Sequence, residues 1–337
     1  MEVTMKGLKL KHMAWGTLAT ILSFSCIFSV HAGQQMPSAV KKVVMASPFS
    51  PLIMPMAHIL EEGLLDKVSK KVELVTWNTP DQLRAMLTRG EVDFVSVPSN
   101  VAAIFYNKGV NLSLARVSIW GVFYLISNDP SVTSLSQLKG ERILVPFRGD
   151  QPDLLFQVIS QSQGLDPLKD FNIQYVSSPL DVTMSLLAGK VDNALMIEPA
   201  AAMALIKAEQ KELKFTRVID VQKEYASAVG NNRGIPNAGV AVLPAAKKKR
   251  AVVETFLKAY DQSVQWTNEN PKEAAELAAR HIQGVNAKAF ENALKYTDFR
   301  SVSGKDAQRD LELMFSRFLE INPKSIGGNL PSQGFYQ

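Results

Sequence analysis

Short apolar runs alternate with amphipathic stretches through the first half of the chain. Apolar runs at 43–46, 72–76 and 94–97 predict strands, and the stretches between them predict helices at 52–66, 81–89 and 99–107. In 52–66, for example, apolar side chains recur close to the helical period. Strands that alternate with helices of this length indicate a parallel sheet with crossover helices.

The same plan starts again after Ser127. Strands are predicted at 142–145, 172–176 and 193–197, with helices at 152–163, 180–188 and 199–209. A weak internal repeat connects the two halves, because Pro80 precedes Gly90 by the same distance as Pro179 precedes Gly189, and each glycine is followed by x-Val-Asp. Each glycine suits a helix C-terminal cap. Any two βαβ units share such features, but the repeat favours two similar lobes.

Two extended passages are candidates for the connections between the lobes. One is the pair of apolar runs at 114–119 and 122–126, broken by Trp120-Gly121, and the other is 237–243. Helices predicted at 245–268, 272–281, 287–295 and 305–320 should then pack back on the first lobe. The expected organisation is lobe 1 at 40–121 plus 240–325 and lobe 2 at 122–239, after a leader at 1–32.

The leader has the pattern of a cleavable signal peptide. Lys6, Lys9 and Lys11 precede an uncharged apolar run at 13–30, and small residues end it at Ala32. The run is nearly long enough to span a bilayer, so an uncleaved anchor is the alternative. No later segment has an apolar run of that length. We expect an exported, periplasmic protein.

The position of the cysteine and the distribution of charge argue against several classes of function. Cys26 is the only cysteine and lies in the leader. Lipoprotein anchoring through it is not expected, because 23–25 is a poor lipobox. The remaining chain would hold no disulfide or thiolate metal site, and its histidines, His58 and His281, lie far apart in sequence. The basic run at 247–250 stands alone and suits a solvated helix start, so nucleic-acid binding is not indicated.

Several short motifs together resemble a known family. They are Ser-Pro-Phe-Ser at 47–50, Gly-Glu-Val-Asp at 90–93, Leu-Lys-Gly-Glu-Arg-Ile at 138–143, Gly-Lys-Val-Asp at 189–192, Glu198-Pro199, and the helical tail with Asn-Pro-Lys-Glu-Ala-Ala at 270–275. This order resembles the type II periplasmic binding proteins of ABC importers, closest to the nitrate/sulfonate/taurine-type and thiamine-precursor-type subgroup. The resemblance covers nearly all of the chain after the leader.

The resemblance implies an α/β fold of two doubly wound lobes, joined by two hinge crossings and followed by a helical C-terminal extension. It further implies a monomeric solute receptor that delivers its ligand to a membrane permease driven by a separate ATPase. The chain has no Gly-x-x-x-x-Gly-Lys-[Ser/Thr] phosphate loop of its own. A module that reports a ligand to a membrane sensor is an open alternative.

Candidate site residues follow from where such folds bind ligands. In open α/β sheets the ligand lies outside the carboxyl ends of the strands, where helix N-termini favour anions. The candidate ligand-binding residues on these loops are Ser47, Phe49, Ser50, Trp77, Asn78, Ser99, Asn100, Trp120, Arg148, Gly149, Asp150 and Glu198. Most have an ordinary structural alternative. Ser50 suits a helix N-cap, Trp77 can cover the end of a sheet, and Trp120 can pack in a hinge.

The second lobe supplies the charged candidates. Arg148 suits bidentate binding of a carboxylate, sulfonate or phosphonate, although an Arg148–Asp150 surface pair is the alternative. Glu198 lies where the family often has an acid facing the cleft, or it caps the helix near Pro199. Rings such as Phe49 would instead suit a flat heterocycle, such as a thiamine-precursor-type pyrimidine. We favour a small polar or anionic ligand: a sulfonate, nitrate or a taurine-like molecule.

Catalysis is not expected. The chain has no Gly-x-Ser-x-Gly and no His-Glu-x-x-His motif. The same superfamily includes thiamine pyrimidine synthases that use cysteine and histidine residues around iron, but this chain lacks cysteine after the leader. We therefore expect no enzyme activity, no cofactor and no metal site.

Overall fold

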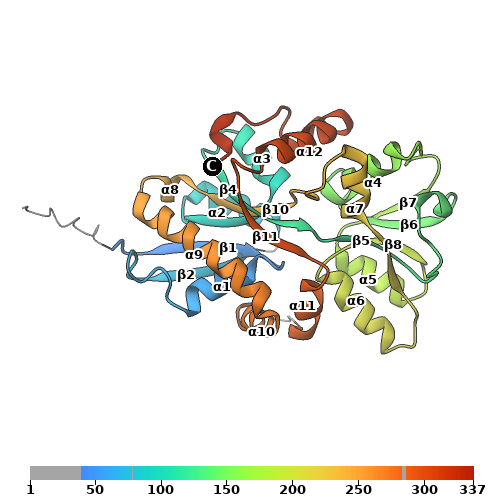
Figure 1. Cartoon of the computed structure of the whole chain (residues 1–337), viewed down its shortest axis with the longest axis horizontal. Coiled ribbons are helices and arrows are strands. Elements are labelled where there is room, and N and C mark those ends of the chain that lie inside the picture. The colour runs from blue at the N-terminus through green and yellow to red at the C-terminus, as the bar shows by residue number, and fades with distance from the viewer. Residues whose placement is uncertain (1–38, 78, 283–285) are drawn as a thin grey trace, which may run out of the picture. The chain divides into compact units, whose positions relative to one another are not determined.

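The computed structural model describes residues 39–77, 79–282 and 286–337. The predicted leader at 1–32 and the candidate Asn78 lie outside the described residues. The described chain folds around two β-sheets with helices packed against them (Figure 1). No helix of the described part combines the length and apolar character needed to cross a bilayer.

Sheet one has six strands in the order β11-β4-β10-β3-β1-β2. They are β1 (Val43–Pro48), β2 (Val72–Trp77), β3 (Phe94–Pro98), β4 (Ser113–Gly121), β10 (Ala238–Val242) and β11 (Asp298–Ser303). β1 is parallel to β2 and β3, and β10 is antiparallel to both β3 and β4. The carboxyl ends of β1 to β4 therefore meet at one edge.

Sheet two has five strands in the order β7-β6-β8-β5-β9. They are β5 (Phe123–Ser127), β6 (Arg142–Pro146), β7 (Asn172–Val176), β8 (Asn193–Ile197) and β9 (Thr216–Asp220). β6 is parallel to β7 and β8, whereas β5 is antiparallel to β8 and β9. Every strand predicted from the apolar runs is present, and β9 and β11 are additional.

The crossover helices follow the strands as predicted. Sheet one carries α1 (Ile53–Glu61), α2 (Pro80–Arg89) and α3 (Ser99–Asn107), and sheet two carries α4 (Gln151–Ser162), α5 (Pro179–Leu187), α6 (Ala200–Glu209) and α7 (Val221–Val229). The internal repeat corresponds to matching caps. Thr79 accepts from the Gln82 amide and Ser178 from the Asp181 amide, both at 3.2 Å, at the starts of α2 and α5.

The C-terminal tail is mostly helical and packs mainly on sheet one, but one of its helices also contacts α6 of sheet two. It contains α8 (Pro244–Lys247), α9 (Arg250–Glu269), α10 (Pro271–His281), α11 (Ala287–Leu294) and α12 (Gln308–Ile321), with short 3-10 turns η2 (Pro323–Ile326) and η3 (Gln333–Phe335); a further one, η1 (Leu135–Leu138), precedes β6. The rings of Phe94 on β3 and Phe256 on α9 stack with centroids 3.6 Å apart. Thus sheet one is built from both ends of the described chain.

One predicted helix, at 245–268, is broken after α8. Lys249 leaves the helical conformation at φ −115° and ψ 66°. Its ammonium lies 2.6 Å from Asp93, a residue only 3% exposed, whose other carboxylate oxygen accepts from the Val44 amide at 3.0 Å. The basic run is therefore not wholly solvated: Lys249 neutralises a buried acid beside β1.

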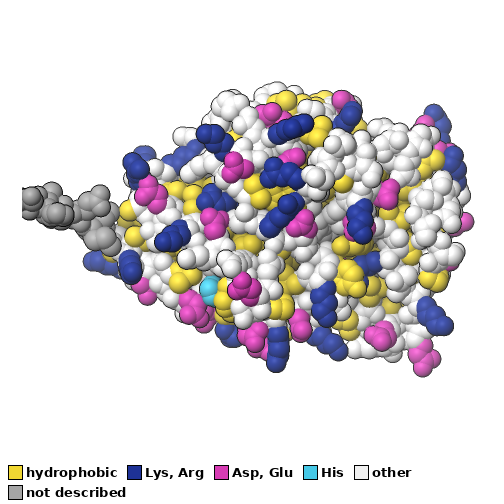
Figure 2. All heavy atoms as spheres, in the orientation of Figure 1, with side chains coloured by type: hydrophobic (Ala, Val, Ile, Leu, Met, Phe, Trp, Pro, Cys, Tyr) yellow, Lys and Arg dark blue, Asp and Glu magenta, His cyan; other side chains and the backbone are white. Residues whose placement is uncertain are grey.

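On one face of the molecule (Figure 2) the charged side chains are mixed rather than separated by sign. On the face seen in Figure 2, Lys and Arg side chains are interspersed with Asp and Glu over both sheets' helices. This face offers no single basic tract of the kind that binds a phosphate backbone.

Candidate functional site

The carboxyl edges of the two sheets are joined by a short crossing. β4 ends at Gly121 and β5 starts at Phe123. Phe123 pairs with Ile197 at the carboxyl end of β8, and Ala238 pairs with both Pro98 and Ile119. The loops that follow β1 to β3 and β6 to β8 therefore lie at the edges linked by this crossing, where ligands bind in such folds.

The loop after β1 contains one exposed ring. Ser50 Oγ accepts from the Leu52 amide at 3.3 Å in the turn before α1, but the helix begins after Leu52 without a side-chain cap, so Ser50 is not its N-cap. Ser47 is fully buried, with its hydroxyl 3.4 Å from the Pro48 carbonyl. Phe49 is 36% exposed and meets the ring of Phe290 on α11 edge-on, with centroids 5.4 Å apart. Of these three candidates, Phe49 presents the accessible surface.

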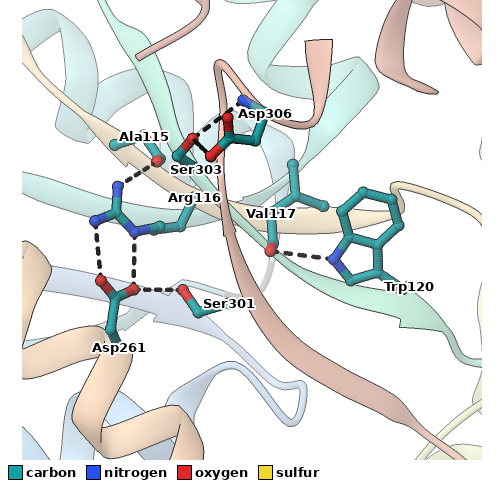
Figure 3. A network of polar contacts seen from close by, with 8 residues as sticks. All are labelled: Ala115, Arg116, Val117, Trp120, Asp261, Ser301, Ser303 and Asp306. Atoms are coloured by element: carbon teal, nitrogen blue, oxygen red, sulfur yellow. Dashed lines mark hydrogen bonds and ion pairs between the residues drawn. The ribbon is translucent and has the colours of Figure 1, made fainter. Parts of the chain in front are cut away.

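The two candidate tryptophans are packed. Trp77, at the end of β2, is 8% exposed, and its buried Nε1 has no partner. Trp120 is fully buried, and its Nε1 donates to the Val117 carbonyl at 3.2 Å (Figure 3). The guanidinium carbons of Arg233 and Arg300 lie 5.1 and 4.6 Å from the Trp120 ring. This geometry favours hinge packing for Trp120.

Two candidates, Asn100 and Asp150, meet at a seam between the sheets, which we define as Ser99, Asn100, Gly149, Asp150 and the residues hydrogen-bonded to them. Asn100 Nδ2 donates to Asp150 Oδ1 at 2.7 Å, joining the first turn of α3 to the residue that caps α4. The seam continues into the tail, where Asn322 Nδ2 donates to the Gly149 carbonyl at 3.1 Å. The seam is thus made by residues far apart in sequence.

The seam contains buried polar atoms without partners. They are Ser99 Oγ, Asn100 Oδ1, Asn237 Oδ1 and Ser325 Oγ. The Asn100 amide cannot be reversed, because its nitrogen donates to two acceptors, Asp150 Oδ1 and the Ser325 carbonyl. Each unsatisfied buried polar atom costs about 1–3 kcal/mol. Water or a polar ligand that entered a parted seam would recover part of that free energy.

The loop after β6 presents a ring and a charge. Phe147 has a left-handed φ of 59° and is 41% exposed, and Gly149 has φ 75°. Arg148 is exposed, lies 5.0 Å from the centroid of Tyr175, and forms no ion pair within the described residues. Positive φ at a phenylalanine is a strained conformation of the kind concentrated at functional sites. No sequence signal pointed to Phe147, because its exposure depends on this backbone conformation.

Hydrogen bonds hold the base of this loop. Asp153 Oδ2 accepts from the Gly149 amide at 2.7 Å, and its Oδ1 accepts from Tyr175 Oη at 3.0 Å. Burial, with the charge of Asp153, raises the pKa of Tyr175 to about 12, so the phenol stays a donor at neutral pH. Asp150 is engaged with Asn100 and the Gln151 amide. The alternative Arg148–Asp150 pair is not formed.

Glu198 is fully engaged within sheet two. It is 1% exposed, and its Oε1 accepts from Arg217 Nε at 2.8 Å and from an Arg217 terminal nitrogen at 2.5 Å. Its Oε2 accepts from the Ala202 amide at 3.0 Å in the first turn of α6. Burial raises the pKa of Glu198, and Arg217 opposes that rise. The capping alternative is therefore supported, and both carboxylate oxygens are occupied by protein donors.

Sequence reasoning did not single out the partners of Glu198. Arg217 lies on β9, a strand that was not predicted, and its guanidinium carbon is 3.6 Å from the ring centroid of Tyr296. The β-branched residues Thr216, Val218 and Ile219, which are enriched in strands, were the available signal. Within the described residues, no three His, Cys, Asp or Glu side chains are grouped as metal ligands.

A comparison with models of protein families assigns this chain to one of them. The family model described as menaquinone biosynthesis matches residues 46–318. The chain belongs to this family. A comparison with curated proteins found no match.

Several solved structures share the fold of this protein. An ABC transporter protein from Parabacteroides distasonis is 26% identical, with a TM-score of 0.74 over 88% of this chain and 99% of that one. The periplasmic aliphatic sulphonate-binding protein SsuA from Escherichia coli is 17% identical, with a TM-score of 0.68 over 88% and 94%. The periplasmic nitrate-binding protein NrtA from Synechocystis PCC 6803 is 12% identical, with a TM-score of 0.65 over 85% and 84%. The predicted resemblance and fold class are confirmed.

Proposed function

We propose that this protein is a solute-binding receptor of an ABC-type importer that holds a small anion between the carboxyl edges of its two sheets. The observation that carries this proposal is the Asn100–Asp150 hydrogen bond, which brings a loop of each sheet together beside Arg148, an exposed residue that forms no ion pair with the described part of the chain. The fold shared with the Parabacteroides distasonis ABC transporter protein supports this role.

The ligand would be an anion with an apolar or flat part. Arg148 supplies two parallel donors for a carboxylate, sulfonate or phosphonate. The rings available at these edges are Phe49 and Phe147, which are 36% and 41% exposed, rather than the buried Trp77 and Trp120. Glu198 would act by supporting the loop after β8, because its oxygens already accept from Arg217 and Ala202.

Binding would be coupled to movement of the lobes predicted at 40–121 plus 240–325 and at 122–239. A ligand that contacts loops of both lobes binds the closed form more tightly than the open form, and so shifts the population toward closure. The unpartnered polar atoms of the seam favour such an equilibrium, because opening admits water to them.

The expected setting follows from the leader at 1–32. Its cleavage would release the protein into the periplasm, where the sulfonate- and nitrate-binding neighbours are found. A monomer would then deliver the ligand to a membrane permease with a separate ATPase. A sensory role for the same ligand-binding loops is the alternative and would require a membrane sensor as the partner.

A second candidate function is chemistry on the bound molecule, favoured by the family's description as menaquinone biosynthesis. Incubating the purified protein with its ligand and following the ligand's mass over time separates the two roles. A receptor returns the ligand unchanged, whereas turnover would make the protein an enzyme.

The receptor proposal is tested by native mass spectrometry of protein purified without denaturation, followed by calorimetry with ethanesulfonate, nitrate and benzoate. We expect a co-purifying small molecule and binding of at least one anion. Arg148→Ala should weaken that binding by about ten- to a hundred-fold, the effect of a lost charge-assisted pair. Arg84→Ala is the matched control, since Arg84 is an exposed arginine on α2 paired with Asp81. No bound molecule and no anion binding would refute the receptor; equal affinities in both variants would refute the role of Arg148.

A further inference from the structure

A segment of the C-terminal tail reaches from sheet one to sheet two. α11 packs against α6 of sheet two, and the chain then enters β11 of sheet one (Figure 1). Phe290 of α11 belongs to an apolar cluster with Ile53 and Met54 of α1, and Asp298 pairs with Gly121 of β4. The α11–β11 segment, from Ala287 to Ser303, is therefore anchored on sheet one at both of its ends.

Tyr296, between α11 and β11, makes the contacts to sheet two. Its backbone carbonyl accepts from Tyr124 Oη on β5 at 3.0 Å. Its ring faces the guanidinium of Arg217 on β9, with 3.6 Å between the guanidinium carbon and the ring centroid. The Tyr124 and Tyr296 rings also meet edge-on, with centroids 5.8 Å apart. Two strands of sheet two thus hold one residue of the tail.

Arg217 is in turn held by the acid at the candidate site. Its side chain is 11% exposed and bonded to Glu198, which is itself fixed by the Val122 carbonyl accepting from its backbone amide at 2.9 Å. A guanidinium that is already desolvated and oriented loses little freedom when it stacks on a ring, so the cation–π contact is favourable. Separating Tyr296 from sheet two would expose this guanidinium face to water and leave it with Glu198 and the more distant Tyr124 ring, whose centroid is 5.6 Å away.

We propose that Tyr296 is a positioning residue: it fastens the α11–β11 segment to sheet two and holds the two sheets in the arrangement described here, without touching the ligand. The effect on sheet separation is independent of the proposed function, whereas the effect on ligand release rests on it. Loss of the ring should favour separation of the sheets and accelerate release of a ligand held between them.

The test measures the separation directly. Cys26 is the only native cysteine, so in a Cys26→Ser background Lys70→Cys and Lys214→Cys place spin labels on exposed positions before β2 and before β9. Distances between the labels are measured by pulsed electron paramagnetic resonance without ligand. Tyr296→Ala and Tyr296→Leu should both broaden the distance distribution. Tyr296→Phe should restore the original one, because it retains the ring; the backbone carbonyl that accepts from Tyr124 is present in every variant.

Leu168→Ala, at a 68% exposed site in sheet two's surface loops, is the matched control and should change nothing. Thermal unfolding identifies any variant that fails to fold, and Tyr296→Leu then replaces Tyr296→Ala. Unchanged distances in the folded Ala or Leu variant would overturn the proposal, as would an equal change in Tyr296→Phe.

Ligand release gives the second measurement, with ethanesulfonate as the probe. Tyr296→Ala should raise its dissociation rate about three- to thirty-fold, the range expected for a desolvated cation–π contact. If the unaltered protein binds nitrate or benzoate instead, that anion replaces ethanesulfonate as the probe. If it binds none of the three, the anion assignment has failed, and the label distances alone decide the role of Tyr296. If it binds and the rate is unchanged in Tyr296→Ala, the coupling to release is refuted.

Discussion

The ion pair between Glu198 and Arg217 allows a quantitative prediction. Arg217→Met removes the guanidinium while keeping a long apolar side chain over Tyr296. The Glu198 carboxylate then retains only the Ala202 amide as a donor, in a side chain with no exposed surface. We expect this substitution to destabilise the protein strongly, because a buried charge loses its partner.

The magnitude follows from the burial of both partners. Removing one member of a buried pair costs about 3–5 kcal/mol, whereas an exposed pair contributes about 0–1 kcal/mol. The double variant Glu198→Gln/Arg217→Met should recover a large part of the loss, because no unpaired carboxylate remains. The residual cost would be the lost cation–π contact with Tyr296, about 0.5–2 kcal/mol.

The direction in which this loss of stability changes with pH can also be predicted. Burial already raises the pKa of Glu198, and removing Arg217 removes the influence that lowers it. A carboxyl whose pKa is raised in the folded state favours folding below its unfolded-state pKa, and this stability is lost as the pH rises through the folded-state pKa. Arg217→Met should therefore lose more stability at pH 8 than at pH 5.

Urea unfolding followed by tryptophan fluorescence measures these free energies as a double-mutant cycle. Lys169→Met is the control, because Lys169 and Asp166 form an exposed pair at 2.7 Å. A loss in Arg217→Met no greater than in this control, or a loss that is largest at acid pH, would contradict the reasoning.

Two further predictions concern buried titratable groups. Lys249→Met should cost about 3–5 kcal/mol in urea unfolding, because it leaves the buried Asp93 without its cation; full stability would show that the fold does not depend on this ion pair. Burial lowers the pKa of His58 from 6.5, so stability should fall as the pH drops below about 6.5 toward the folded-state pKa. His58→Gln should lose that pH dependence, and an unchanged profile between pH 7 and 5 would assign it to other groups.

The local elements of this protein could be predicted from its sequence. Apolar runs and helical periodicity are short-range signals, and the caps that delimit α2 and α5 depend on residues within one turn, such as Thr79 and Ser178. The alternation of strands and helices then indicated two parallel-type sheets. The seam residues Ser99, Asn100, Gly149 and Asp150 were found for the same reason, because the loops after parallel strands meet at one edge.

Only the tertiary structure decided which side chains are buried and which are exposed. Trp120 and Trp77 are buried, whereas Phe49 and Phe147 are exposed, although all four are aromatic residues at strand ends. That difference depends on which distant elements cover each ring and, at Phe147, on a left-handed backbone conformation.

The same holds for the long-range ion pairs. Lys249 interrupts a helix to reach Asp93, and Arg217 joins Glu198 to Tyr296 across the two sheets. The partner of a charged residue cannot be read from the sequence, because pairing depends on desolvation and on segments that are brought together only when the chain folds. The sequence by itself therefore determined the elements and the edge where loops gather, and the fold decided which side chains remain free there.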